Sequence, residues 1–222
     1  RSTGIAIMAF AQVSIGATIN AAMAIDLTFT DMQSLGTYVV ATPDDVEQQI
    51  FAGRMTYVVA SSDDPRFATG SSFHSFCVDL NQPAVPAPHT YEFFSNQDDT
   101  PNGDHGIDDL PVPGSSSLGL AKAQAISALY QTRFVEATTA GSLEASAFQL
   151  ALWEIVFEPG SAGGLGTLDL SSGDGTFRVV QGPPPARNLA QSWLDEISGM
   201  NFSTISDGLI GFGTDVVQDH IT

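Results

Sequence analysis

The chain contains one cysteine, Cys77, in the segment SFCVDL (75–80). A single thiol excludes an internal disulfide framework and a cysteine-rich zinc site. Three interpretations stay open: a buried small hydrophobic residue, an intermolecular disulfide, or a reactive group. A Cys/His hydrolase would need a histidine within hydrogen-bond reach of the thiol. His74, the nearest in sequence, is expected on the opposite strand face. The other histidines have no supporting motif: His89, His105 and His220.

The elements that must position the thiol follow from the local pattern. Alternation along a strand from Phe73 to Leu80 places Phe73, Ser75, Cys77 and Asp79 on one face. The other face carries His74, Phe76, Val78 and Leu80. Downstream, the segment 143–157 has helical apolar spacing, and Phe148 and Leu152 define its core face. Gln149 borders that face, so periodicity alone does not decide between a solvent-facing and a site-facing glutamine.

The two segments together resemble the thioester domains of bacterial surface proteins: SFCVDL (75–80) on a strand and FQLALWEI (148–155) on a helix. In that family, a cysteine sulfur and a glutamine side-chain carbonyl form an internal thioester. The resemblance implies that Cys77 is the nucleophile and leaving group and that Gln149 is the acyl carrier. An amine, typically a lysine of a target, then becomes amide-linked to Gln149. The order of motifs also looks like that of exported Gram-negative proteins with a PEP-CTERM sorting tail. Those motifs are IFAG (50–53), the two segments above, GTF (175–177), AQSWL (190–194) and QD (218–219).

Four residues of the two motifs are expected to support the bond. Trp153 lies one helical turn beyond Gln149 and could shield the bond from solvent. Asp79 could orient a neighbouring group, although a carboxylate beside sulfur also raises the thiol pKa. The aromatic neighbours Phe76 and Phe148 complete the set. A covalent link over 72 residues would also restrict the unfolded chain by roughly 4 kcal/mol, by analogy with a disulfide.

Composition limits the partners. The chain has 25 acidic and 7 basic residues, a net charge of −18, which argues against nucleic acid and anionic membrane surfaces. The one lysine, Lys122, leaves few internal amines to quench an acyl donor. We hypothesise that the scarcity of lysine protects the thioester from attack within the chain. An explanation of at least equal weight is that acidic exported proteins are simply poor in lysine.

The N-terminal region predicts export. An apolar run from Gly4 to Ala17 is followed by the A-x-A pattern 22–24, as in a secretory signal spanning residues 1–24 with Ile25 as the first mature residue. The alternative is a strand or helix of the fold. A membrane-spanning helix needs about 20 apolar residues, and this run is shorter and less apolar than that. No second such segment exists, so we expect no membrane span. The PEP-CTERM tail is not in this sequence, so we expect either a clipped chain or a different sorting route.

The remaining pattern predicts an α+β fold, with a β-barrel or sandwich-like core and a helical second half, in a single domain over 25–222. Strands are expected at 25–30, 36–40, 55–60, 73–80, 91–94 and 175–180. Helices are expected at 118–135, 143–157 and 187–198, of which the first two could form a subdomain at about 117–158. The proline-rich segment 81–117 is predicted to be mostly loop.

The acidic segment 98–109 partly matches an EF-hand loop. Thr100 and Pro101 depart from that pattern, and no amphipathic helix precedes it, so a solvated acidic loop is favoured over calcium binding. The candidate ligands would be Asp98, Asn102, Asp104 and Asp109. No other cofactor is expected.

These features predict a secreted or cell-surface protein that couples covalently to amines on a partner or matrix. It would be a single-turnover binder and not an enzyme. The alternative is an extracellular structural protein in which the Cys77–Gln149 link serves stability only. Calcium-dependent adhesion is a third class and depends on the acidic segment alone.

Overall fold

The computed structural model describes residues 24–32, 36–42, 46–96, 106–159, 165–171, 177–200, 203–215 and 217–222. Within these ranges the strands are β1 (Ala24–Asp31), β2 (Gly36–Ala41), β3 (Gln48–Gly53), β4 (Met55–Ser62), β5 (Ser72–Cys77), β6 (Pro88–Ser95), β7 (Val179–Gln181), β8 (Ile210–Gly213) and β9 (His220–Ile221). The helices are α1 (Leu120–Thr139), α2 (Ser142–Phe157) and α3 (Pro184–Ser198), with a 3-10 turn η3 (Ile107–Asp109).

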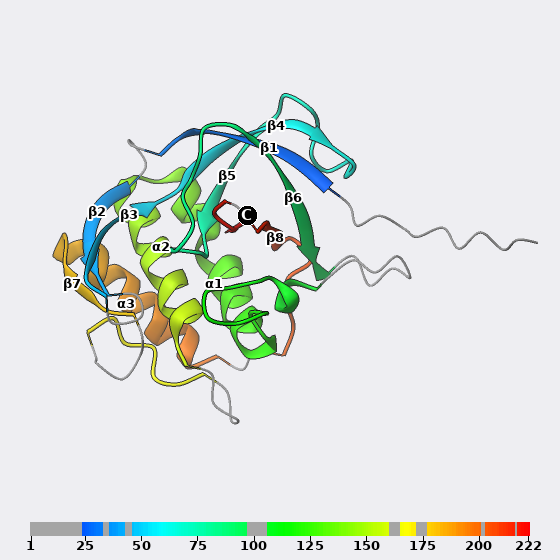
Figure 1. Ribbon diagram of the computed structural model, residues 1–222. Helices are drawn as coiled ribbons and strands as arrows, with labels where there is room; N and C mark the ends of the chain where they lie inside the picture. The colour runs from blue at the N-terminus through cyan, green and yellow to red at the C-terminus, as the bar shows by residue number, and fades with distance from the viewer. Residues whose placement is uncertain are drawn as a thin grey trace, which may run out of the picture.

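Six strands close into an antiparallel barrel in the order β1-β4-β5-β9-β8-β6 (Figure 1). Closure removes the exposed edges that an open sheet would leave. The barrel interior is filled by aromatic rings, with Phe73 and Phe212 5.4 Å apart and Phe67 5.5 Å from Phe212. The mixed α+β class predicted from the sequence is confirmed, and the β core is a barrel.

The second sheet has three strands in the order β3-β2-β7. Only Arg54 separates β3 of this sheet from β4 of the barrel, so one nearly continuous extended segment contributes a strand to each sheet. Arg54 Nη1 donates to the carbonyl oxygens of Ala137 and Thr138 in the last turn of α1. A cation at this end of a helix satisfies carbonyls that lack a partner within the helix.

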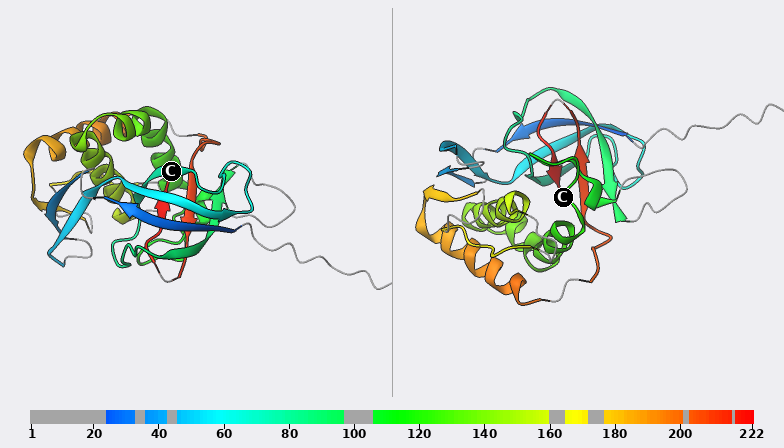
Figure 2. Two further views of the ribbon diagram at one scale, coloured as in Figure 1. Left: turned by 90° about the horizontal axis from the view of Figure 1, so that it is seen from above. Right: turned by 60° about the horizontal axis from the view of Figure 1, so that its bottom comes forward.

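Helix α2 lies at the centre of the molecule and contacts β2, β3, α1 and α3. Figure 2 shows the helices gathered beside the barrel, with the small sheet flanking them. Thirteen consecutive residues of α2, from Ala145 to Phe157, are buried. A helix that is apolar on all sides is expected in such an environment. The consequence is that Gln149, Glu154 and Ser146 are polar groups held away from water.

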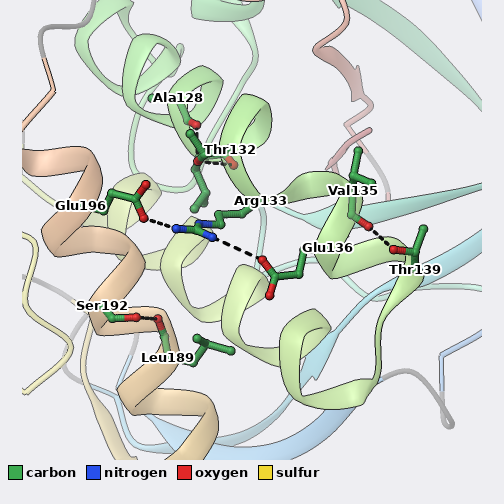
Figure 3. Close-up of polar contacts among 10 residues, drawn as sticks. Ala128, Thr132, Arg133, Val135, Glu136, Thr139, Leu189, Ser192 and Glu196 are labelled. Atoms are coloured by element: carbon green, nitrogen blue, oxygen red, sulfur yellow. Dashed lines mark hydrogen bonds and ion pairs between the residues drawn. The ribbon is translucent and has the colours of Figure 1, made fainter.

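An ion-pair cluster joins α1 to α3. Arg133 contacts Glu136 on its own helix at 3.4 Å and Glu196 on α3 (Figure 3). Its guanidinium also lies 5.4 Å from the centre of the Trp193 ring. The planar guanidinium can therefore serve two carboxylates and an aromatic face at once.

Several boundaries differ from those predicted. The strand predicted at 73–80 ends at Cys77, because Phe76 and Cys77 are the residues of β5 that pair with β9 and the chain then turns. Asp79 therefore lies outside the strand, and the prediction that it shares the strand face of Cys77 is wrong. The third helix begins at Pro184 and not at Arg187, since proline suits the first helical turn, where no N–H is needed. The sequence does not predict β3, β8 or β9.

Some predictions fall on other parts of the chain. The expected signal lies outside the described residues except for Ala24, which begins β1. Of the calcium candidates, Asp98, Asn102 and Asp104 lie outside them, and Asp109 is in η3. Among the described residues, none of the helices is long and apolar enough to cross a membrane.

Candidate functional site

Cys77 and Gln149 are in direct contact. The backbone N–H of Cys77 donates to Oε1 of Gln149 at 2.9 Å, and Nε2 of Gln149 donates to the carbonyl oxygen of Cys77 at 2.8 Å. Both residues are buried, with 3% of Cys77 and 1% of Gln149 exposed. The end of β5 supplies one partner and the middle of α2 the other. The residue pair singled out by the sequence thus meets across 72 positions of chain.

The reciprocal bonds have a chemical consequence for the carboxamide. The N–H of Cys77 is fixed on the oxygen that would become negative if a nucleophile attacked Cδ of Gln149. A preorganised donor at this position is the arrangement of an oxyanion hole. The glutamine is also held in one orientation, because both of its polar ends have partners.

The sulfur has its own hydrogen bond. Sγ of Cys77 donates to the carbonyl oxygen of Asp79 at 2.9 Å, and Nε2 of Gln218 donates to the same oxygen at 3.0 Å. The Asp79 carboxylate instead accepts the N–H of Asn81 at 2.6 Å. Asp79 therefore contacts the thiol through its backbone, and its side chain stabilises the turn that follows β5.

Burial raises the pKa of the Cys77 thiol well above its usual value. The carboxylate of Asp79 adds to this increase and that of Asp219 adds less, whereas Trp153 and the Asp79 backbone lower the thiol pKa. The resting group is consequently a thiol and not a thiolate. A reaction at this sulfur must remove the thiol proton, and negative charge then develops on Sγ in a buried site with little water.

A cavity of about 200 Å³ lies against the pair. The described residues that line it are mostly apolar and include no carboxylate, ammonium or guanidinium group: Met32, Ile50, Phe51, Gly53, Met55, Cys77, Leu80, Ala84, Gln149, Trp153 and Gln218. A molecule that reached Cys77 through this cavity would meet hydrocarbon and amide groups. Charged molecules are disfavoured in such surroundings.

The aromatic residues predicted to support the site divide into two groups. Phe76 and Phe148 pack against each other with ring centres 4.4 Å apart, on the side of β5 that faces the helices. Their packing joins the strand to α2 beside Cys77 and Gln149. Trp153 is on the cavity side, packs against Phe177 at 5.9 Å, and lines the cavity with Cys77 and Gln149.

One close neighbour of Cys77 was not identified from the sequence. His220 pairs directly with Cys77 across the β5–β9 ladder, is buried, and places its ring 4.5 Å from that of Tyr57. Its Nε2 is 3.2 Å from the hydroxyl of Tyr91. Burial lowers the pKa of His220 to about 3, so the imidazole is neutral. Nothing local to His220 could have signalled this contact, because it joins strands 143 residues apart in sequence.

The hydrolase alternative gains no support from these contacts. Of the histidines in the described ranges, His220 bonds to Tyr91 and His74 to Thr56, and none is hydrogen-bonded to the thiol. Among the described residues there is also no cluster of three or more histidine, cysteine or acidic side chains suited to a metal ion.

Comparison with protein-family models, with curated proteins and with solved structures gives no match for this chain. The functional argument therefore depends on the geometry of the site.

Proposed function

We propose that Cys77 and Gln149 condense to an internal thioester that couples the protein to amines. In this step the Sγ–H bond of Cys77 and the Cδ–Nε2 bond of Gln149 break and an Sγ–Cδ bond forms. The amide nitrogen takes the thiol proton and leaves as ammonia. No oxidant or cofactor is needed.

The observation that carries this proposal is the pair of reciprocal hydrogen bonds between Gln149 and the Cys77 backbone. They hold a carboxamide against the backbone of the residue that carries the only thiol of the chain, and the bond to Oε1 favours negative charge on that oxygen. Holding two reacting groups in place can contribute roughly 7–11 kcal/mol to lowering a barrier. Burial adds protection of the product from water.

In the second step a neutral amine attacks Cδ of Gln149. Its nitrogen forms an amide, the Cδ–Sγ bond breaks, and the sulfur recovers a proton from that nitrogen. Each molecule reacts once, so the protein is a covalent binder and not an enzyme. The uncharged cavity is consistent with an amine that enters in its neutral form. An amine-bearing partner or matrix outside the cell is the proposed target, in keeping with the export expected from the sequence.

Intact mass spectrometry tests the proposal. The native protein should be lighter than its sequence by one ammonia, and Cys77→Ala and Gln149→Ala should both remove that deficit. Gln131→Ala, at an exposed glutamine of α1, is the matched control and should keep it. Methylamine should add its own mass to the native protein and to the control only. A native mass without the deficit would refute the thioester.

The burial of both partners favours one alternative, a link that serves stability only. The same experiment separates the two functions. A protein that shows the ammonia deficit but stays unchanged in methylamine, while denatured protein reacts, would have a structural cross-link.

A further inference from the structure

Trp153 is placed to act on the sulfur and not only to cover it. It lies four residues after Gln149 on α2, so the two side chains project from the same side of the helix. Both line the cavity together with Cys77, and Trp153 is 1% exposed.

The indole N–H of Trp153 is a buried donor without a conventional hydrogen bond among the described residues. Such groups are uncommon in folded proteins, because a donor removed from water without an acceptor is destabilising. Where one occurs next to a reactive residue, its partner can be a group that gains charge during the reaction.

The sulfur of Cys77 is the acceptor that fits. The Trp153 side chain lowers the pKa of the Cys77 thiol and so favours the charged form of the sulfur, although Nε1 makes no hydrogen bond to the sulfur in the resting structure. A neutral thiol is a weak acceptor, whereas a sulfur that becomes negative accepts strongly, so the indole N–H and the sulfur are expected to pair as charge develops. The other influences on the sulfur, burial and the carboxylates of Asp79 and Asp219, oppose charge there.

We propose that the Nε1–H of Trp153 is a catalytic hydrogen-bond donor to Sγ of Cys77. This inference rests on the proposed function for its role in the reaction. When an amine attacks Cδ of Gln149, the electron pair of the Cδ–Sγ bond moves to sulfur, and the indole N–H stabilises that charge until the sulfur takes the proton of the amine. In thioester formation the same donor stabilises the sulfur as it loses its proton.

The deciding experiment does not require a thioester. In the Gln149→Ala background, where the bond cannot form, the alkylation rate of Cys77 by iodoacetamide is followed against pH. Trp153→Phe should move the midpoint of this profile to higher pH. A purely space-filling tryptophan predicts the opposite pattern, faster alkylation with an unchanged midpoint, because the smaller ring leaves the cavity wider. An unchanged or lowered midpoint overturns the inference.

Trp193→Phe is the matched control, since Trp193 is also buried but lies on α3 beneath Arg133. It should leave the midpoint unchanged. If Trp153→Phe fails to fold, benzothienylalanine at position 153 keeps the bicyclic shape, replaces only the N–H, and should shift the midpoint in the same direction.

With Gln149 present, Trp153→Phe should slow methylamine coupling by about 10- to 100-fold. Removal of one charge-stabilising donor typically costs about 100- to 1000-fold, and sulfur is a weaker acceptor than an oxyanion. Trp193→Phe should stay near the native rate. Absence of the thioester from the native protein would refute the proposed function, yet the alkylation profile would still decide whether Trp153 donates to the sulfur.

Discussion

A double-mutant cycle on Cys77 and Gln149 separates a covalent link from a contact. The two hydrogen bonds between these residues use only the backbone of Cys77. Cys77→Ala therefore makes both bonds but cannot form a thioester, whereas a native protein with the thioester has lost Nε2 as ammonia and keeps only the bond to Oε1. Gln149→Ala removes the bonds and the acyl group together. The two single variants thus respond differently to the presence of a bond.

The magnitudes follow from the geometry. A link that closes 72 residues contributes about 4 kcal/mol to the free energy of unfolding. With the thioester, Cys77→Ala should lower this free energy by about 3–4 kcal/mol, because the link is lost and the bond from Nε2 is regained. Without it, only a small side chain is lost, at about 1 kcal/mol. Gln149→Ala should cost about 1–3 kcal/mol for each buried backbone group that it leaves unpaired: the N–H and the carbonyl of Cys77 without a thioester, and the N–H alone, together with the link, when the thioester forms.

Urea unfolding of the native protein, both single variants and the double variant gives the coupling energy. A thioester predicts coupling of about 3–4 kcal/mol, because either substitution alone already removes the link and Cys77→Ala regains the bond from Nε2. Mass spectrometry of samples recovered after unfolding shows that the link survives the measurement. Coupling near zero would refute the covalent link, since the Cys77→Ala variant retains the backbone groups that bind Gln149.

Three further predictions concern the surroundings of the site. Burial raises the pKa of Asp219 to about 7, so its contribution to stability is present below pH 4 and is lost as the pH rises through 7. Between pH 4 and 8, ionisation of Asp219 should lower the free energy of unfolding by up to about 4 kcal/mol, and Asp219→Asn should abolish this decrease. An unchanged pH profile in unfolding experiments would contradict the assignment. Phe148→Ala should lower the free energy of unfolding by about 3–5 kcal/mol, because a fully buried ring leaves a cavity against Phe76. A loss under 1 kcal/mol would mean that strand and helix are not fastened there. Arg54→Met should lower the thermal midpoint and cost about 1–2 kcal/mol, since the carbonyls at the end of α1 lose a charged donor, whereas a neutral result would indicate that water replaces the guanidinium.

The sequence predicts the long elements well and the short ones poorly. Alternating runs with clear turn residues correspond to β1, β2, β4 and β6, and helical spacing corresponds to α1 and α2. Strand β8, IGFG, and strand β9, of two residues, carry no such period. Their pairing is set by closure of the barrel, which is a tertiary effect. The same effect ends β5 at Cys77, three residues before the alternation in the sequence stops.

The site was predictable as a pair of residues but not as a set of contacts. A resemblance in two short segments singled out Cys77 and Gln149, and their contact follows from the packing of α2 against the end of the barrel. The hydrogen bonds between them involve backbone groups, which every residue type carries, so no sequence pattern encodes them. The neighbours Met55 and His220 come from strands far apart in the chain and meet only in three dimensions.

The passage of one continuous stretch of chain from the small sheet into the barrel has a mechanical consequence. Ile50, Phe51 and Gly53 precede Arg54, Met55 follows it, and all four of these flanking residues border the cavity beside the thiol. A change in the angle between the two sheets would thus be taken up at Arg54 and would move the cavity wall that these four residues form.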